Sequence, residues 1–151
     1  MLYKILSDKT FSLLMQLHAK EIMDYLFENN HEFSILANTK EITFDPKLPE
    51  HISKNFKQVI LFTLAGYTYE SCQIDEENLY FEAGFGEENF GSFITVPLYA
   101  IMQILIDENP VFINLSYPYK KEQEEENRGL EKSMEIFTSN PENKKLLKKK
   151  K

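Results

Sequence analysis

The amino-acid sequence predicts a mixed α+β domain, in which an N-terminal helix precedes a small, strongly bent antiparallel sheet or partial barrel. Apolar residues recur with helical spacing between Asp8 and Asn29. Several short segments rich in β-branched and aromatic residues follow, with few further helical patterns. After Pro118 the composition becomes charged. We therefore expect a packed domain over residues 1–117 and a flexible charged tail over residues 118–151.

The predicted helix begins at Ser7 or Asp8, either of which is suited to cap it, and ends at Asn29. At helical spacing one apolar face consists of Phe11, Leu14, Met15, His18, Ile22, Tyr25 and Leu26. Further apolar side chains fall outside that face: Leu13, Leu17, Met23 and Phe27. They have two interpretations: a broad core contact, or a second surface such as a dimer interface formed by Leu13, Leu17 and Phe27.

The predicted strands follow in the order 33–38, 41–44, 58–64, 67–74, 79–85, 92–96 and 111–116, with a proline-marked loop before the third. Residues 58–64 are β-branched and aromatic, which favours a central strand. Residues 79–85 alternate with a period of two, and residues 86–91 are expected to close a hairpin into the next strand. Pro97 is suited to the first turn of a short helix that would run to about Glu108.

The charge of the chain is unevenly distributed. The whole chain has 17 Lys and Arg against 24 Asp and Glu, a net charge of −7, yet its last eleven residues hold six Lys and one Glu. The remainder therefore carries 11 basic and 23 acidic residues, a net charge of −12. Such an acidic body repels phosphate backbones and argues against nucleic acid as the main ligand.

The sequence also bears on compartment and chemistry. Its single cysteine, Cys72, precludes an intrachain disulfide and suits a reducing compartment. No signal peptide or membrane span is predicted, so we expect a cytoplasmic protein with no membrane partner. His18, His31 and His51 are scattered, without cysteines or carboxylates at metal-ligand spacing, and Cys72 has the pattern of a packing residue. We therefore expect no catalytic residues, no enzyme activity, no metal and no other cofactor.

Short motifs between residues 20 and 116 resemble the stringent starvation protein B (SspB) family. The first is an F-x-A-x-F-G pattern, here Phe81, Ala83, Phe85 and Gly86. The second is a strand followed by Pro-Leu, here Ile94, Val96, Pro97, Leu98, Ala100 and Ile101, with Glu108 and Asn109 after it. Upstream, residues 23–26 and 28–29 resemble the aromatic end of the family's helix. The tail departs from the family pattern because it is shorter and rich in lysine.

The resemblance implies an SspB/Sm-like partial β-barrel that forms a homodimer through its first helix. It implies an adaptor that binds proteins carrying ssrA-type degradation tags and delivers them to the ClpXP protease. The tail would then dock on the ClpX unfoldase, through Leu146, Leu147 and Lys148. An adaptor of this kind needs no chemistry of its own, because a flexible tether raises the local concentration of the substrate.

Peptide binding also has a physical basis in the residues. Main-chain hydrogen bonds to a strand edge provide affinity, and side-chain pockets provide specificity. Ala83 and Gly84 are small enough for a peptide backbone to approach, and Tyr67, Phe85 and Phe112 are candidates for the pocket walls. The alternative is that all five pack inside the barrel. A second function, an Sm-like nucleic-acid-binding module, rests on fold analogy and is opposed by the acidic body.

Overall fold

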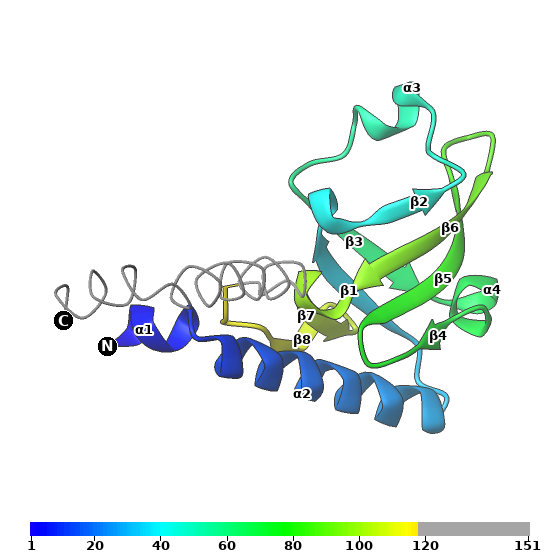
Figure 1. The fold of residues 1–151 in the computed structure, drawn as a ribbon. Coiled ribbons are helices and arrows are strands. Elements are labelled where there is room, and N and C mark those ends of the chain that lie inside the picture. Colours follow the sequence, from blue (N-terminus) through cyan, green and yellow to red (C-terminus); the bar gives the residue numbers. More distant parts are fainter. Residues whose placement is uncertain (118–151) are drawn as a thin grey trace, which may run out of the picture. The chain divides into compact units, whose positions relative to one another are not determined.

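The computed structural model describes residues 1–117 (Figure 1). The predicted tail over residues 118–151 lies outside the described residues, and so do Leu146, Leu147 and Lys148. The helical elements are α1 (Leu2–Leu6), α2 (Lys9–Glu28), η1 (Thr39–Glu41), α3 (Glu50–Ser53), α4 (Gly66–Glu70) and η2 (Leu98–Ala100). The strands are β1 (Phe33–Asn38), β2 (Thr43–Asp45), β3 (Val59–Leu64), β4 (Gln73–Ile74), β5 (Asn78–Phe85), β6 (Phe90–Pro97), β7 (Ile101–Ile106) and β8 (Asn109–Ile113).

The strands form two antiparallel four-stranded sheets. One sheet has the order β3-β1-β7-β8 and the other the order β2-β6-β5-β4. The predicted α+β class and the antiparallel pairing are thereby confirmed. The two sheets do not close into a barrel. The hairpin predicted over residues 79–96 is confirmed as β5 and β6, which pair from Asn78 with Pro97 to Phe85 with Phe90.

The hydrophobic core lies between the inner faces of the two sheets and also includes the buried side chains of α2. Phe62 of β3 and Phe81 of β5 meet across it, with their ring centroids 5.1 Å apart and an edge-to-face angle of 71°. Strand alternation places every second residue of β5 and β6 in this core. The largest fully buried side chains are Phe81, Met23, Ile35, Leu64, Leu79, Ile94, Leu98, Ile101, Ile104 and Val96.

Helix α2 begins where the sequence predicts but buries a different face. The Asp8 side chain caps it, since its Oδ2 accepts a hydrogen bond from the Phe11 N–H at 3.0 Å. The buried residues are Ser12, Ala19, Met23 and Leu26. Of the predicted face, Leu14, His18 and Tyr25 are exposed. The prediction was wrong there because a count of apolar residues overlooks Ser12 and Ala19, whose small side chains allow close packing.

The segment predicted as a strand over residues 67–74 is mostly helical. Residues 66–70 form α4, and only Gln73 and Ile74 form a strand, β4. Gly66 reverses the direction of the chain with a φ of +57°, a backbone conformation that residues with a Cβ seldom adopt. Its N–H donates to Glu32 Oε2 at 2.6 Å. This contact holds the start of α4, which brings Tyr67 over β5.

Two further predictions were wrong. The helix expected from Pro97 to about Glu108 is a single 3₁₀ turn, η2, followed by strand β7. Three isoleucines suit that strand, which pairs with both β1 and β8. Strand β3, expected at the centre of a sheet, is an edge strand, and its outward-facing Leu61 is exposed. In both cases the pairing of distant strands outweighed the local pattern.

The two ends of the described chain contact each other. The N–H of Tyr117 donates to the carbonyl oxygen of Leu6 at 2.7 Å. The rings of Tyr3 and Tyr117 lie 5.8 Å apart between centroids. The last described residues therefore run beside α1.

Candidate functional site

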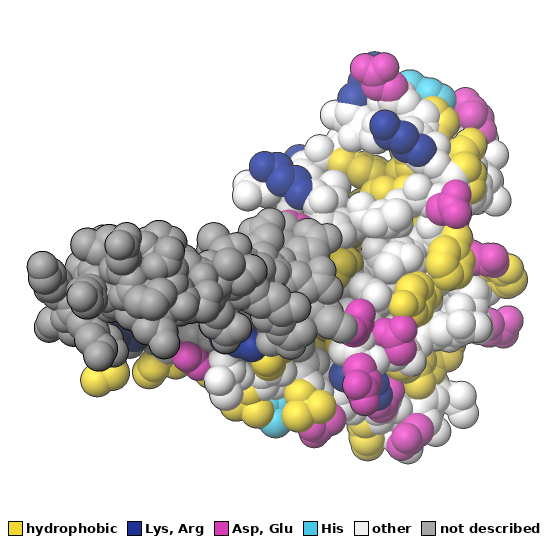
Figure 2. All heavy atoms as spheres, viewed as in Figure 1, with side chains coloured by type: hydrophobic (Ala, Val, Ile, Leu, Met, Phe, Trp, Pro, Cys, Tyr) yellow, Lys and Arg dark blue, Asp and Glu magenta, His cyan; other side chains and the backbone are white. Residues whose placement is uncertain are grey.

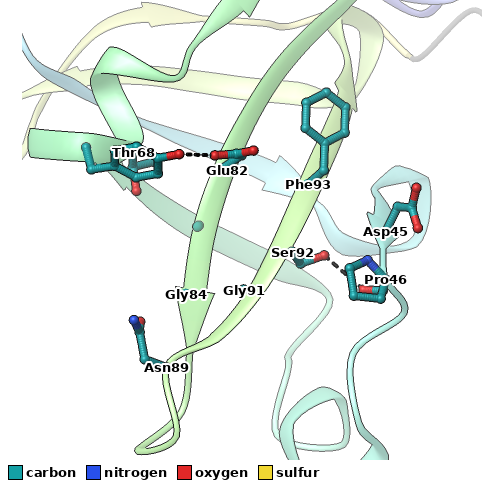
Figure 3. A pocket seen from close by; sticks show the side chains of 11 residues that line it. Asp45, Pro46, Thr68, Glu82, Gly84, Asn89, Gly91, Ser92 and Phe93 are labelled. Atoms are coloured by element: carbon teal, nitrogen blue, oxygen red, sulfur yellow. Dashed lines mark hydrogen bonds between the residues drawn. The ribbon is translucent and has the colours of Figure 1, made fainter.

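A groove of about 560 Å³ crosses the outer face of the β5–β6 hairpin, and we refer to it as the groove (Figure 3). It extends from α4 on one side to the end of β2 on the other. The residues that line it are Asp45, Pro46, Tyr67, Thr68, Glu82, Ala83, Gly84, Asn89, Gly91, Ser92 and Phe93. They belong to segments that are distant in the sequence and are brought together by the pairing of β2, β6 and β5.

Two glycines form the floor of the groove. Gly84 of β5 is paired with Gly91 of β6, so neither strand projects a side chain at this position. A Cβ on Gly84 would lie 1.8 Å from Asn89 Oδ1, whereas one on Gly91 would meet nothing within 4 Å and would project into open space. The Asn89 side chain lies against Gly84, so it is at Gly91 that another chain can approach the sheet closely.

The walls of the groove are aromatic and polar. On one side the Tyr67 hydroxyl donates a hydrogen bond to Glu82 Oε2, which holds α4 against β5. That bond to a carboxylate raises the pKa of Tyr67, so the hydroxyl stays protonated and keeps donating at neutral pH. On the other side Ser92 Oγ donates to the carbonyl oxygen of Pro46 at 3.0 Å and fixes the end of β2. Phe93 stands between the two sides with 43% of its surface exposed.

One edge of β5 is open beside the groove. Strand β4 pairs only with Leu79 and Tyr80, so within residues 1–117 the rest of β5 has no strand partner on that edge. The Glu82 N–H points to this edge, where it donates to Ser71 Oγ at 2.9 Å. Because main-chain groups alternate along a strand, the N–H and C=O of Gly84 point to the same edge. They are available to an extended chain.

The structure brings together three of the five residues predicted to bind peptide. Tyr67, Ala83 and Gly84 all line the groove. Phe85 points to the opposite face of β5, where its ring packs against the ring of Phe44 with the centroids 5.8 Å apart. Phe112 lies on β8 in the other sheet and packs against the core. For these two residues the alternative interpretation, packing inside the domain, fits the structure.

The other residues that line the groove were not predicted from the sequence. The alternation of residues 90–97 was a usable signal for Phe93, because it places Gly91, Phe93 and Thr95 on the outer face. No local pattern pointed to Asp45 and Pro46, since they reach the groove only through the pairing of β2 with β6.

The Cys72 thiol is partly buried and is not activated as a nucleophile. Burial raises the pKa of the Cys72 thiol to about 12, so at neutral pH it is protonated and a poor nucleophile. Its Sγ donates to the carbonyl oxygen of Thr68 at 3.3 Å. No group of three His, Cys, Asp or Glu side chains within residues 1–117 is arranged to hold a metal ion.

A second surface with exposed apolar side chains lies on the first two helices. Leu13 and Leu17 of α2 are 44% and 52% exposed, and apolar side chains show along the lower edge of the molecule over α2 (Figure 2). Residues of α1 are exposed as well. Phe27, predicted alongside Leu13 and Leu17, faces the core instead, where its ring lies 5.2 Å from that of Phe33. It therefore lies apart from the exposed leucines.

Comparison with known proteins adds no further constraint on the site. Neither the protein-family models nor the curated proteins include one that matches this sequence. Among the described residues, no helix combines the length and apolar character needed to cross a membrane.

Proposed function

We propose that this protein is an adaptor that binds ssrA-type degradation tags in the groove and delivers the tagged proteins to the ClpXP protease. The observation that supports the proposal best is the glycine floor beside the open edge of β5. An extended peptide needs a backbone that it can approach, main-chain groups to pair with and side-chain pockets. Gly91 supplies the approachable backbone, the edge of β5 supplies the main-chain groups, and Tyr67 and Phe93 supply the walls of side-chain pockets.

The resemblance to the SspB family supports the same proposal, since its F-x-A-x-F-G motif coincides with the part of β5 that borders the groove. The finer fold implied by that family, an SspB/Sm-like partial barrel, is proposed with it. The charge of the described residues opposes the alternative, an Sm-like nucleic-acid-binding module, because residues 1–117 hold seven Lys against 17 Asp and Glu. An adaptor of a cytoplasmic protease would act in the cytoplasm and would need no cofactor.

Removal of residues 141–151 separates the two proposed activities. Without the proposed ClpX-docking segment, we expect an unchanged Kd for a fluorescent ssrA-tag peptide but loss of stimulated degradation of a tagged substrate by ClpXP. Fluorescence anisotropy and a degradation assay measure the two, with a scrambled tag as the control. If neither chain binds the tag better than the scrambled peptide, the proposal is wrong; if truncation also weakens tag binding, the tail is not a simple tether.

The exposed leucines of α2 support a homodimer as part of the proposal. Apolar side chains on a helix surface gain free energy when a partner copy covers them. We expect the Leu13→Glu, Leu17→Glu double variant to sediment as a monomer where the wild type sediments as a dimer, with the circular dichroism of the fold retained. Tyr25→Glu, at another exposed position of α2, is the control and should remain dimeric. A wild-type protein that sediments as a monomer would contradict the proposed dimer.

A further inference from the structure

The charged residues that line the groove are all acidic. Asp45 lies on the β2 side and Glu82 on the α4 side, and no Lys, Arg or His is among the lining residues. Lys47 follows Pro46 in the sequence but does not line the groove. The groove therefore has a negative potential.

The two carboxylates flank one aromatic ring. In the register of the sheet, Phe93 is paired with Asp45 on β2 and with Glu82 on β5. Directly paired side chains on one face of a sheet have their Cβ atoms roughly 5 Å apart. The order across the outer face is thus acid, aromatic, acid, and Figure 3 shows Phe93 standing between Glu82 and Asp45.

Neither carboxylate is neutralised within the described residues. Glu82 Oε2 accepts a hydrogen bond from the Tyr67 hydroxyl, and Glu82 forms no ion pair within residues 1–117. The Asp45 carboxylate has neither an ion pair nor a hydrogen-bonding partner there. The ring of Tyr80 stacks against one side of the Phe93 ring, with the ring centroids 6.1 Å apart and an angle of 20° between the ring planes. An aromatic face with a carboxylate on each side is a good environment for a cation.

We infer that the groove selects peptides that carry a Lys or Arg side chain, placed over Phe93 between Asp45 and Glu82. The inference deepens the proposed function and rests on it. The cation would gain two ion pairs and a cation–π contact, while an adjoining small residue of the peptide would lie on Gly91. A Glu at the same peptide position would face two like charges and would be rejected.

The test is a substitution scan of the host's ssrA-tag peptide, in which each position is replaced in turn by Lys, Gln and Glu. We expect one position at which Lys binds most tightly and Glu most weakly, with about tenfold between their Kd values at low salt, because each partly exposed ion pair contributes only a modest factor. The preference should diminish as the salt concentration rises. If Lys and Glu bind equally at every position of a tag that does bind, the inference is wrong and the proposed function stands.

Variants of the protein assign the preference to the two carboxylates. Glu82→Gln keeps an oxygen that accepts the hydrogen bond from the Tyr67 hydroxyl but removes the negative charge. Asp45→Asn removes the negative charge on the other side of Phe93. Each should reduce the Lys-over-Glu ratio roughly threefold. Glu87→Gln removes the same charge from the hairpin tip, outside the groove, and should leave the ratio unchanged. A ratio that falls equally in all three variants would indicate long-range charge alone and would overturn the assignment. Failure of the unmodified tag to bind would overturn the proposed function as well.

Discussion

Replacement of Gly91 by valine is expected to weaken peptide binding at least about tenfold while the protein stays folded. A Cβ at Gly91 meets nothing within 4 Å, and the residue does not have a positive φ, so a larger side chain fits without strain. That side chain would stand on the floor of the groove, where a bound backbone would have to lie. We expect the Kd for an ssrA-tag peptide to rise by at least about tenfold, which corresponds to about 1.4 kcal/mol.

The same substitution should leave stability unchanged or raise it. Glycine in a strand costs roughly 0.5–1 kcal/mol relative to residues that restrict the unfolded chain, and valine favours strands. Urea denaturation and peptide anisotropy on the same preparation would show weaker peptide binding with no loss of stability. Thr95→Val, on the same face of β6 but outside the groove, is the matched control and should bind normally. A Gly91→Val protein that binds the tag with the wild-type Kd would place the peptide site elsewhere.

Truncation of Phe81 to alanine is expected to destabilise the fold by about 3–5 kcal/mol. Phe81 is fully buried, and its ring packs against Phe62, so it joins the two sheets. Its removal deletes this contact and leaves a cavity between β3 and β5 that neighbouring side chains fill only in part. The free energy of unfolding from urea titration measures the loss, which is a large part of the 5–15 kcal/mol typical of a domain.

Phe93→Ala is the companion variant, because Phe93 lies on the same hairpin but faces outward. Its truncation should cost less than about 1 kcal/mol of stability, since the side chain is half exposed, yet it should weaken tag binding. If Phe81→Ala lost as little stability as Phe93→Ala, the assignment of inner and outer faces of the hairpin would be wrong.

The parts of the fold that could be predicted from the sequence are those set by neighbouring residues. The cap at Asp8 and the length of α2 follow from local hydrogen bonding and helical spacing. The β5–β6 hairpin follows from a two-residue alternation on each side of a turn. Each of these two signals is carried by residues close together in the sequence, so neither requires knowledge of distant contacts.

The remaining features depend on contacts between distant residues. The isoleucines of β7 fit either a buried helix or a strand, and it is the pairing with β1 and β8 that makes this segment a strand. The site shows the same limit. Gly84 was found from its size, but the row formed by Asp45, Phe93 and Glu82 exists only because β2 and β5 both pair with β6.

The contact between Tyr3 and Tyr117 has a consequence for how this fold can be used as a module. Because the chain returns to its starting helix, the described unit has both of its ends at one place on its surface. A unit with adjacent ends can be inserted into a loop of a host protein without stretching that loop. Such an insertion would leave the hairpin and its glycine floor unaltered, and would carry the proposed peptide groove to an unrelated scaffold.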